Sequence, residues 1–233
     1  MTMIESKLQD VRARVAAACR AFGRDADAVG LLAVAKTFPA EAVRQAHAAG
    51  QRDFGENYIQ EAVDKMAALR GLPLVWHCIG PIQSNKTRLV AEHFDWVHSV
   101  DRLKIAERLS AQRPEGLPPL NVCLQVNIDG GPTKSGVAPA EAAALARAVV
   151  ALPRLRLRGL MTIPEPAPDF EATLASHTLA KALFEQLKAE GLPLDTLSMG
   201  MSADLEPAIA AGSTLVRVGS AIFGTRPAKP GAK

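Results

Sequence analysis

Lys36 is the residue of this chain whose position points most directly to covalent chemistry. It follows the apolar run 31–35, which predicts a buried strand, so its amine stands at the end of a hydrophobic segment. Desolvation disfavours the charged form of an amine, and a neutral amine condenses with aldehydes to form a Schiff base. Most lysines at strand ends are solvated caps or ion-pair partners, however. Lys36 therefore indicates a reactive site only if other segments supply the rest of it.

A second candidate segment lies near the end of the chain. The run 216–220 ends a predicted strand on Gly219 and Ser220. Glycine lets the backbone approach a ligand closely, and backbone N–H groups with a hydroxyl suit an anion such as phosphate. Ser202 and Gly200, in the preceding loop, could complete this phosphate cup. An ordinary Gly-Ser turn is the alternative interpretation.

Short apolar runs alternate with helical periodicity along most of the chain, after an amphipathic opening helix over 3–23. The predicted strands are 31–36, 53–57, 74–80, 95–100, 120–127, 157–163, 195–200 and 214–219. The predicted helices between them are 39–49, 58–69, 84–93, 102–112, 139–151, 169–190 and 204–211. This α/β pattern predicts a (β/α)8 TIM barrel with an extra N-terminal helix, and an open doubly wound sheet is the competing arrangement.

A closed barrel would bring strand one and strand eight side by side, and with them Lys36 and the phosphate cup. Pyridoxal 5'-phosphate needs that pairing, since its aldehyde requires an amine and its phosphate requires an anion site. Arg217 lies two residues before Gly219, on the same strand face, where it could meet the pyridine nitrogen. A guanidinium only donates hydrogen bonds, so the ring nitrogen would stay unprotonated. Arg217 as an ordinary surface or ion-pair arginine is the alternative.

Composition narrows the class of protein. With 48% hydrophobic and 22% charged residues, the 233-residue chain resembles a globular domain, and a net charge of +3 with 4% aromatics argues against a nucleic-acid-binding face.

We expect no signal peptide, membrane anchor or membrane span. Cys19, Cys78 and Cys123 are far apart in apolar surroundings, which favours reduced thiols in the cytoplasm over a disulfide or metal site. We expect one domain over 1–226 and a disordered tail over 227–233.

Seven segments, in this order, resemble the signatures of the pyridoxal phosphate homeostasis protein family. They are 33–37, 54–61, 76–86, 134–136, 158–161, 198–202 and 217–224. The resemblance covers nearly the whole chain and implies a fold-type III barrel like the N-terminal domain of alanine racemase. It further implies that Lys36 holds the cofactor as an aldimine and that Arg217 faces the ring nitrogen. By the same resemblance, Ser202, Gly219 and Ser220 hold the phosphate, and Asn57 and His77 border the ring.

Some of these assignments have plain structural alternatives. Asn57 could cap the helix that follows it, and His77 could be a satisfied core histidine. The chain also departs from the family pattern at two places, with Ala35 where a serine often precedes the lysine and with the run 130–132 before Lys134. These departures bear on the local loop shape and on any role of Lys134.

We weigh three functions. The first is a non-catalytic carrier that binds pyridoxal 5'-phosphate, keeps it in homeostasis and delivers it to apo-enzymes. The second is a small racemase or decarboxylase that uses Lys36 as its single base. The third is a Schiff-base aldolase without the cofactor. A racemase needs a second acid or base opposite the lysine, which related racemases take from a second domain, and only residues 220–233 follow Gly219. The carrier is therefore favoured, and we expect a monomer.

Overall fold

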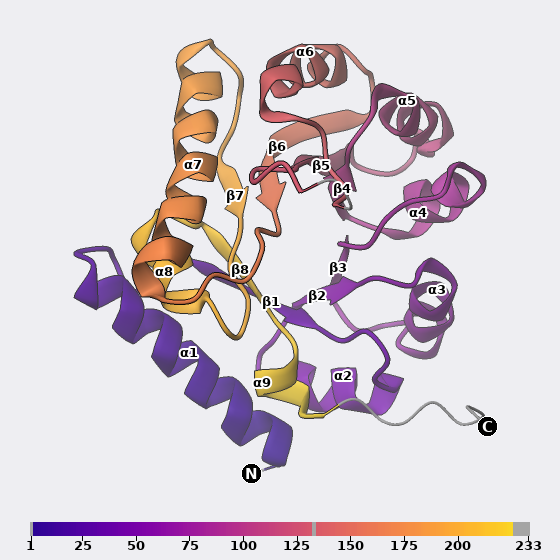
Figure 1. Ribbon diagram of the computed structural model, residues 1–233. Helices are drawn as coiled ribbons and strands as arrows, with labels where there is room; N and C mark the ends of the chain where they lie inside the picture. The colour runs from indigo at the N-terminus through magenta and orange to yellow at the C-terminus, as the bar shows by residue number, and fades with distance from the viewer. Residues whose placement is uncertain (1, 132–133, 226–233) are drawn as a thin grey trace, which may run out of the picture.

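The computed structural model describes residues 2–131 and 134–225, which fold into a closed barrel of eight parallel strands (Figure 1). The strands follow one another around the ring in sequence order. They are β1 (Gly30–Val34), β2 (Asp53–Glu56), β3 (Val75–Cys78), β4 (Trp96–Val100), β5 (Leu120–Val126), β6 (Leu155–Thr162), β7 (Thr196–Ser198) and β8 (Leu215–Val218). The predicted single-domain (β/α)8 barrel is confirmed, and the open doubly wound sheet is wrong.

Helices surround the barrel, and one extra helix precedes it (Figure 1). They are α1 (Met3–Ala21), α2 (Ala40–Ala48), α3 (Ile59–Ala68), α4 (Thr87–His93), α5 (Leu103–Gln112), α6 (Pro139–Val150), α7 (Phe170–Ala189), α8 (Leu205–Ala210) and α9 (Ser220–Phe223), with a 3-10 turn, η1 (Ser84–Lys86), before α4. The sequence pattern did not predict α9, because a four-residue helix shows no periodicity. The predicted tail, 227–233, lies outside the described residues.

Local signals in the sequence explain where the longer helices begin. The Thr2 hydroxyl accepts from the Glu5 N–H while the Glu5 carboxylate accepts from the Thr2 N–H, which is a capping box at the start of α1. The Asp169 carboxylate accepts from the Ala172 N–H and caps α7 in the same way. Leu8, Val11 and Val15 form the buried face of α1, which packs against α8, α9 and α2.

The ring closes where β1 pairs with β8, and this pairing decides the geometry of the site. Gly30 is opposite Leu215 and Ala33 is opposite Val218. From this shared level, Lys36 lies three residues after Ala33 and Gly219 lies one residue after Val218, so both stand at the carboxyl ends of neighbouring strands. The strands themselves are buried on both faces, as expected for a parallel sheet covered by helices. The three cysteines are free and buried, in agreement with the sequence-based expectation.

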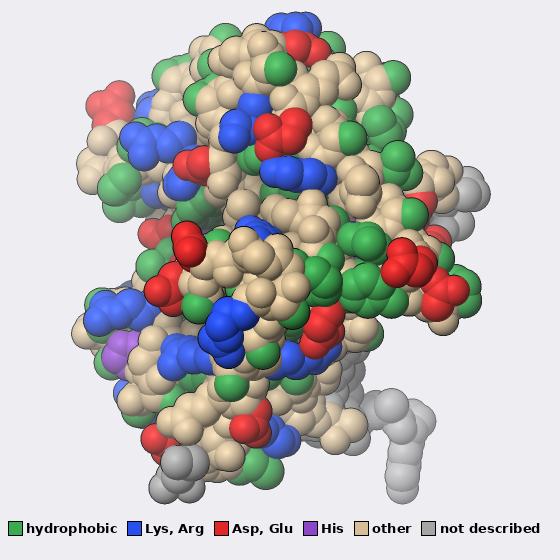
Figure 2. All heavy atoms as spheres, turned by 90° about the vertical axis from the view of Figure 1, so that its left-hand side faces the viewer, with side chains coloured by type: hydrophobic (Ala, Val, Ile, Leu, Met, Phe, Trp, Pro, Cys, Tyr) green, Lys and Arg blue, Asp and Glu red, His purple; other side chains and the backbone are tan. Residues whose placement is uncertain are grey.

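The surface over α1, α7 and α8 mixes cationic, anionic and apolar side chains (Figure 2). A hollow of about 680 Å³ lies there, lined by the end of α1, the start of α7 and the start of α8. Among the described residues, no helix combines the length and the apolar character that a membrane span requires.

Candidate functional site

The carboxyl ends of β1 and β8 border a cavity of about 310 Å³, which lies at the small end of the ~300–1,000 Å³ typical of small-molecule sites. Six of the seven residues singled out from the sequence line it: Lys36, Asn57, Ser202, Arg217, Gly219 and Ser220. Apolar side chains complete the wall: Val34, Phe38, Ile79, Ile163 and Met201. One amine, one guanidinium and two hydroxyls thus share a single, largely apolar cavity.

The backbone on both sides of Lys36 is held by polar side chains of α3. Lys65 Nζ donates to the carbonyl oxygen of Ala35 at 2.8 Å, and the Thr37 N–H donates to Glu61 Oε1 at 2.7 Å. Thr37 has a φ of 68°, a left-handed conformation that is costly for a β-branched residue. The contacts from α3 offset that cost. Lys36 therefore stands on a short segment whose direction is set from both ends.

The residue that anchors this arrangement is Glu56, the last residue of β2. Its carboxylate is fully buried and its Oε1 pairs with Lys65 Nζ at 2.5 Å, while no residue in the described part of the chain hydrogen-bonds its Oε2. Burial raises the pKa of Glu56 to about 7, although the attraction of Lys65 acts in the opposite direction. Lys65 also pairs with Glu61 at 3.2 Å, so the buried Glu56 and Lys65 and the partly exposed Glu61 form one ionic cluster next to the segment that carries Lys36.

Two hydroxyl groups lie close together at one end of the cavity. Ser202 Oγ and Ser220 Oγ lie 3.5 Å apart, one from the loop after β7 and the other from the first residue of α9. The first N–H groups of a helix have no acceptor within the helix, so Ser220 brings a backbone donor as well as a hydroxyl. These donors and Gly219 make this end of the cavity suited to an oxyanion such as phosphate.

The loop that carries Ser202 is held from behind by charged residues. Arg14 Nη1, on α1, donates to the Ser202 carbonyl oxygen at 2.9 Å, and its other nitrogens pair with Glu206 at 2.5 and 2.6 Å. Asp204 Oδ1 accepts from the Met201 N–H at 2.6 Å. These contacts fix the main chain on both sides of the Ser202 side chain.

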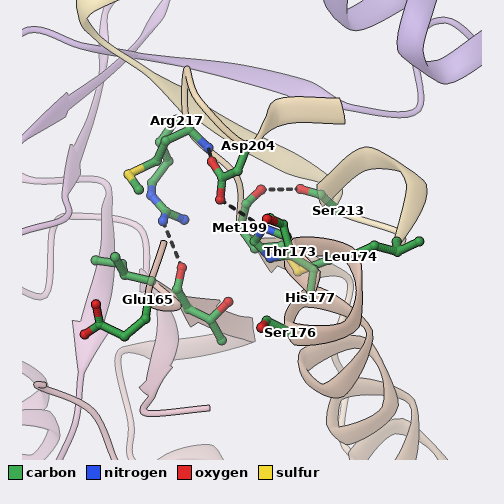
Figure 3. A network of polar contacts seen from close by, with 12 residues as sticks. Glu165, Thr173, Leu174, Ser176, His177, Met199, Asp204, Ser213 and Arg217 are labelled. Atoms are coloured by element: carbon green, nitrogen blue, oxygen red, sulfur yellow. Dashed lines mark hydrogen bonds and ion pairs between the residues drawn. The ribbon is translucent and has the colours of Figure 1, made fainter. Parts of the chain in front are cut away.

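Asp204 also contacts His177 of α7, with 2.9 Å between His177 Nε2 and Asp204 Oδ2 (Figure 3). Burial alone would raise the pKa of Asp204, but its hydrogen bonds with His177 and with the Met201 N–H lower it below the usual value. Asp204 is thus held as a carboxylate, and α7 is joined to the Ser202 loop through it.

Arg217 lines the cavity, and its guanidinium donates hydrogen bonds to two acceptors inside the barrel. Its Nη1 donates to Ser198 Oγ at 2.8 Å. Its Nη2 donates to the Thr162 carbonyl oxygen at 2.9 Å, and Figure 3 draws a hydrogen bond from the guanidinium to a carbonyl oxygen. Burial lowers the pKa of Arg217 to about 10, so it is still protonated at neutral pH. The guanidinium therefore presents a fixed hydrogen-bond donor to whatever fills the cavity.

Asn57 lies at the cavity wall, and its buried Oδ1 has no hydrogen-bond partner among the described residues. The backbone of Asn57 passes very close to Gly80, where a Cβ would come within 2.4 Å of the Asn57 carbonyl oxygen. Only glycine fits there, which accounts for the glycine after β3. A buried oxygen without a partner, on a residue that lines a cavity, is an acceptor that a bound molecule can satisfy.

His77 does not line the cavity. It lies inside the barrel, where its Nδ1 is 2.9 Å from His98 Nε2 and its Nε2 is 3.1 Å from Asp53 Oδ1. Its ring stacks on Trp96, with 5.3 Å between centroids. The expectation that His77 borders a bound ring stays a prediction, and the contact with Asp53 directs this side chain toward the amino-terminal end of β2. The satisfied core histidine, left open above, describes the observed geometry.

Several supporting residues were not identified from the sequence. The spacing of Glu61 and Lys65, four residues apart on one helix, is a visible sign of an ion pair, although it does not say that the pair is buried against Lys36. Nothing local in the sequence marks Arg14, which acts on a residue 188 positions away. The position of Asp204, three residues after Met201, fits a local turn and was overlooked.

Comparison with known proteins agrees with this geometry. Residues 7–227 match the family model of the alanine racemase N-terminal domain. The pyridoxal phosphate homeostasis protein of Pseudomonas aeruginosa is 63% identical over 226 residues, covering 97% of both chains. The protein of the same name from Escherichia coli K12 is 53% identical over 229 residues, covering 97% of this chain and 98% of its own.

Solved structures show the same likeness. The structure of PipY from Synechococcus elongatus with PLP bound superposes with a TM-score of 0.83 at 40% identity, covering 95% of this chain and all of that one. An alanine racemase of Clostridium difficile has a TM-score of 0.69 at 16% identity and covers 86% of this chain and 53% of its own, a likeness in fold alone. By its sequence relatives and by the domain that it matches, this chain belongs to the pyridoxal phosphate homeostasis protein family, which is built on the alanine racemase N-terminal domain.

Proposed function

We propose that the protein binds pyridoxal 5'-phosphate in the cavity between β1 and β8, takes part in its homeostasis in the cytoplasm, and delivers it to apo-enzymes as a monomer. One observation carries the proposal: Lys36, Arg217, Ser202 and Ser220 line the same 310 Å³ cavity. The names of its relatives and the PLP-bound structure of PipY support it. Three free, buried cysteines fit a reducing compartment.

The residues present suit each part of this cofactor. Pyridoxal phosphate supplies an aldehyde that condenses with amines and a conjugated ring that withdraws electrons. Lys36 offers the amine, on a backbone segment held by Lys65 and Glu61. Ser202 and Ser220 offer hydroxyls to the phosphate, and Arg217 offers a donor to the ring nitrogen. The unpaired Asn57 Oδ1 offers an acceptor at the wall.

The proton-transfer groups of the cavity favour a carrier over a racemase. Among the described residues that line it, the titratable side chains are Lys36 and Arg217. Arg217 stays protonated and only donates, so Lys36 alone is suited to accept and return a proton there. Racemisation needs a second acid or base on the other face of the substrate. Binding and release of the cofactor need one amine only.

The test is to trap the cofactor and find where it is attached. The protein is incubated with pyridoxal 5'-phosphate, reduced with borohydride, digested and mapped by mass spectrometry. We expect the added mass on Lys36 and its loss in Lys36→Ala. Attachment to Lys86, Lys104 or Lys134 with Lys36 unmodified would show that the site is wrong. Racemisation or decarboxylation of amino acids at ordinary enzyme turnover, about 1 to 10³ per second, would overturn the carrier function.

Transfer needs a separate measurement. Loaded protein is mixed with an apo-enzyme that requires pyridoxal 5'-phosphate, and the recovery of that enzyme's activity is followed. We expect the activity to recover faster with loaded protein than with the same concentration of cofactor that was first released from the protein and is free in solution. Equal rates would mean that the protein only stores the cofactor.

A further inference from the structure

Five side chains form a continuous chain of hydrogen bonds through the interior of the barrel. Asp53 Oδ1 lies 3.1 Å from His77 Nε2, and His77 Nδ1 lies 2.9 Å from His98 Nε2. His98 Nδ1 lies 2.9 Å from Ser198 Oγ, which accepts from Arg217 Nη1 at 2.8 Å. Neither the carrier function nor the cavity described above explains why two histidines and a serine are buried in this line.

The chain joins the two ends of the barrel. His98 is on β4 and Ser198 is on β7, which are not neighbours in the ring, so their hydrogen bond crosses the interior. His98 and Ser198 are fully buried. At one end, Asp53 is the first residue of β2 and its side chain is 43% exposed. At the other end, Arg217 lines the cavity.

Both histidines are neutral in this setting. Burial lowers the pKa of His77, although Asp53 and Asp95 act in the opposite direction. Burial lowers the pKa of His98 well below its usual value, and the nearby His77 and Arg217 lower it further. A neutral imidazole has one N–H donor and one acceptor nitrogen. Each histidine therefore donates a hydrogen bond to one neighbour and accepts one from the other, so all the hydrogen bonds along the line must run in the same direction.

The two ends of the chain decide that direction. Arg217 can only donate to Ser198, and an ionised Asp53 can only accept from His77. In between, Ser198 donates its hydroxyl proton to His98 Nδ1, and His98 Nε2–H donates to His77 Nδ1. His77 Nε2–H then donates to Asp53. Every donor meets an acceptor, and both histidines carry their proton on Nε2.

If the hydrogen bonds ran in the opposite direction, only the contact at the exposed end, between His77 and Asp53, would be unfavourable. With both protons on Nδ1, His98 would donate to Ser198, and His77 would donate to His98. The bare Nε2 of His77 would then face the Asp53 carboxylate, placing two acceptors against each other. The negative charge of Asp53 thus excludes this arrangement, in which Ser198 would accept from His98 as well as from Arg217.

We propose that the line Asp53–His77–His98–Ser198 is a positioning device for Arg217, and that the charge of Asp53, at the far end of the barrel, sets its direction. Ser198 accepts from Arg217 without competition only when the protons lie on Nε2 of both histidines. The direction of these hydrogen bonds does not depend on any ligand. The effect of this line of side chains on cofactor binding, however, rests on the proposed function.

The first test reads the histidine tautomers in the protein without cofactor. Nitrogen-15 NMR of histidine-labelled protein distinguishes Nε2–H from Nδ1–H, and we expect the Nε2–H form for both His77 and His98 near neutral pH. In Asp53→Asn the side chain keeps its size but can donate as well as accept, so we expect Nδ1–H forms to become populated. Asp27→Asn is the matched control, because Asp27 lines the same surface hollow as Asp53 and lies outside the chain.

An Nδ1–H form or an imidazolium in the unaltered protein, or unchanged tautomers in Asp53→Asn, would overturn the proposed direction.

The second test titrates each protein with pyridoxal 5'-phosphate. We expect Asp53→Asn to bind about 2- to 10-fold more weakly, as for the loss of one well-made hydrogen bond, and Asp27→Asn to bind as the unaltered protein does. Shifted tautomers with unchanged affinity would overturn the positioning role. Failure of the unaltered protein to bind would overturn the proposed function and leave the tautomer result standing.

Discussion

Lys65 Nζ donates to the carbonyl oxygen of Ala35 at 2.8 Å, so a buried side chain of α3 holds the residue directly before Lys36. The same ammonium pairs with Glu56 and Glu61. The candidate amine is thus supported by an ionic cluster that itself lies outside the cavity. This arrangement lets the cluster set the direction of Lys36 while the cavity wall stays mostly apolar.

Lys65→Met should destabilise the protein strongly. Above about pH 7, where Glu56 is ionised, removing the ammonium leaves its carboxylate buried and unpaired, which costs about 3–5 kcal/mol in the free energy of unfolding. Denaturant unfolding measures this loss. Lys181→Met is the control, because Lys181 pairs with Glu185 on the surface and should cost no more than about 1 kcal/mol. Similar losses for the two variants would show that the cluster does not carry the stability assigned to it.

The stability of the protein should depend on pH through Glu56. Its pKa is raised from 4.5 to about 7 by burial, so between these values the folded chain holds a proton that the unfolded chain has released. The contribution of Glu56 to the free energy of unfolding is therefore greatest below about pH 4.5 and decreases as the pH rises to about 7. We expect the unaltered protein to lose stability relative to Glu56→Gln across this window. Parallel curves for the two proteins would contradict the raised pKa.

Arg14→Met should weaken the binding of pyridoxal 5'-phosphate without touching the cavity. Arg14 donates to the Ser202 carbonyl oxygen, and its loss frees the loop that presents the Ser202 hydroxyl. We expect the dissociation constant to rise about 2- to 10-fold in a spectroscopic titration. Arg12→Met is the matched control, since Arg12 lies on the same helix but donates to Ala49 and Gln51. Equal effects of the two substitutions would mean that only general stability had changed.

Ser202→Ala and Ser220→Ala should reduce selectivity for the phosphorylated cofactor. In the proposed function each of these neighbouring hydroxyls donates to the phosphate, and a hydrogen bond to a charged group corresponds to about 10- to 100-fold in affinity. We expect each substitution to weaken binding of pyridoxal 5'-phosphate by that factor and to leave binding of pyridoxal nearly unchanged. Isothermal titration with both compounds measures the difference. A parallel loss for both compounds would place the phosphate elsewhere.

The sequence alone was sufficient to predict the barrel and most of the cavity. Buried strands and amphipathic helices have local periodicities, and their regular alternation restricts the chain to few topologies. In a closed ring, strands one and eight must be neighbours, so Lys36 and Gly219 could be placed together before any coordinates were known. Asn57, which the family resemblance implies at the ring, also lines the cavity.

The tertiary structure decided what supports those residues. The contact of Arg14 with Ser202, the position of Lys65 against Ala35 and the line from Asp53 to Arg217 each depend on how helices pack and on which rotamer a buried side chain adopts. No local pattern encodes those choices, since they arise from the simultaneous packing of segments that are far apart in the chain. For the same reason the sequence left open whether His77, which the family resemblance implies at the ring, is a core histidine, and it could not locate the two polar partners that the neighbouring strands supply.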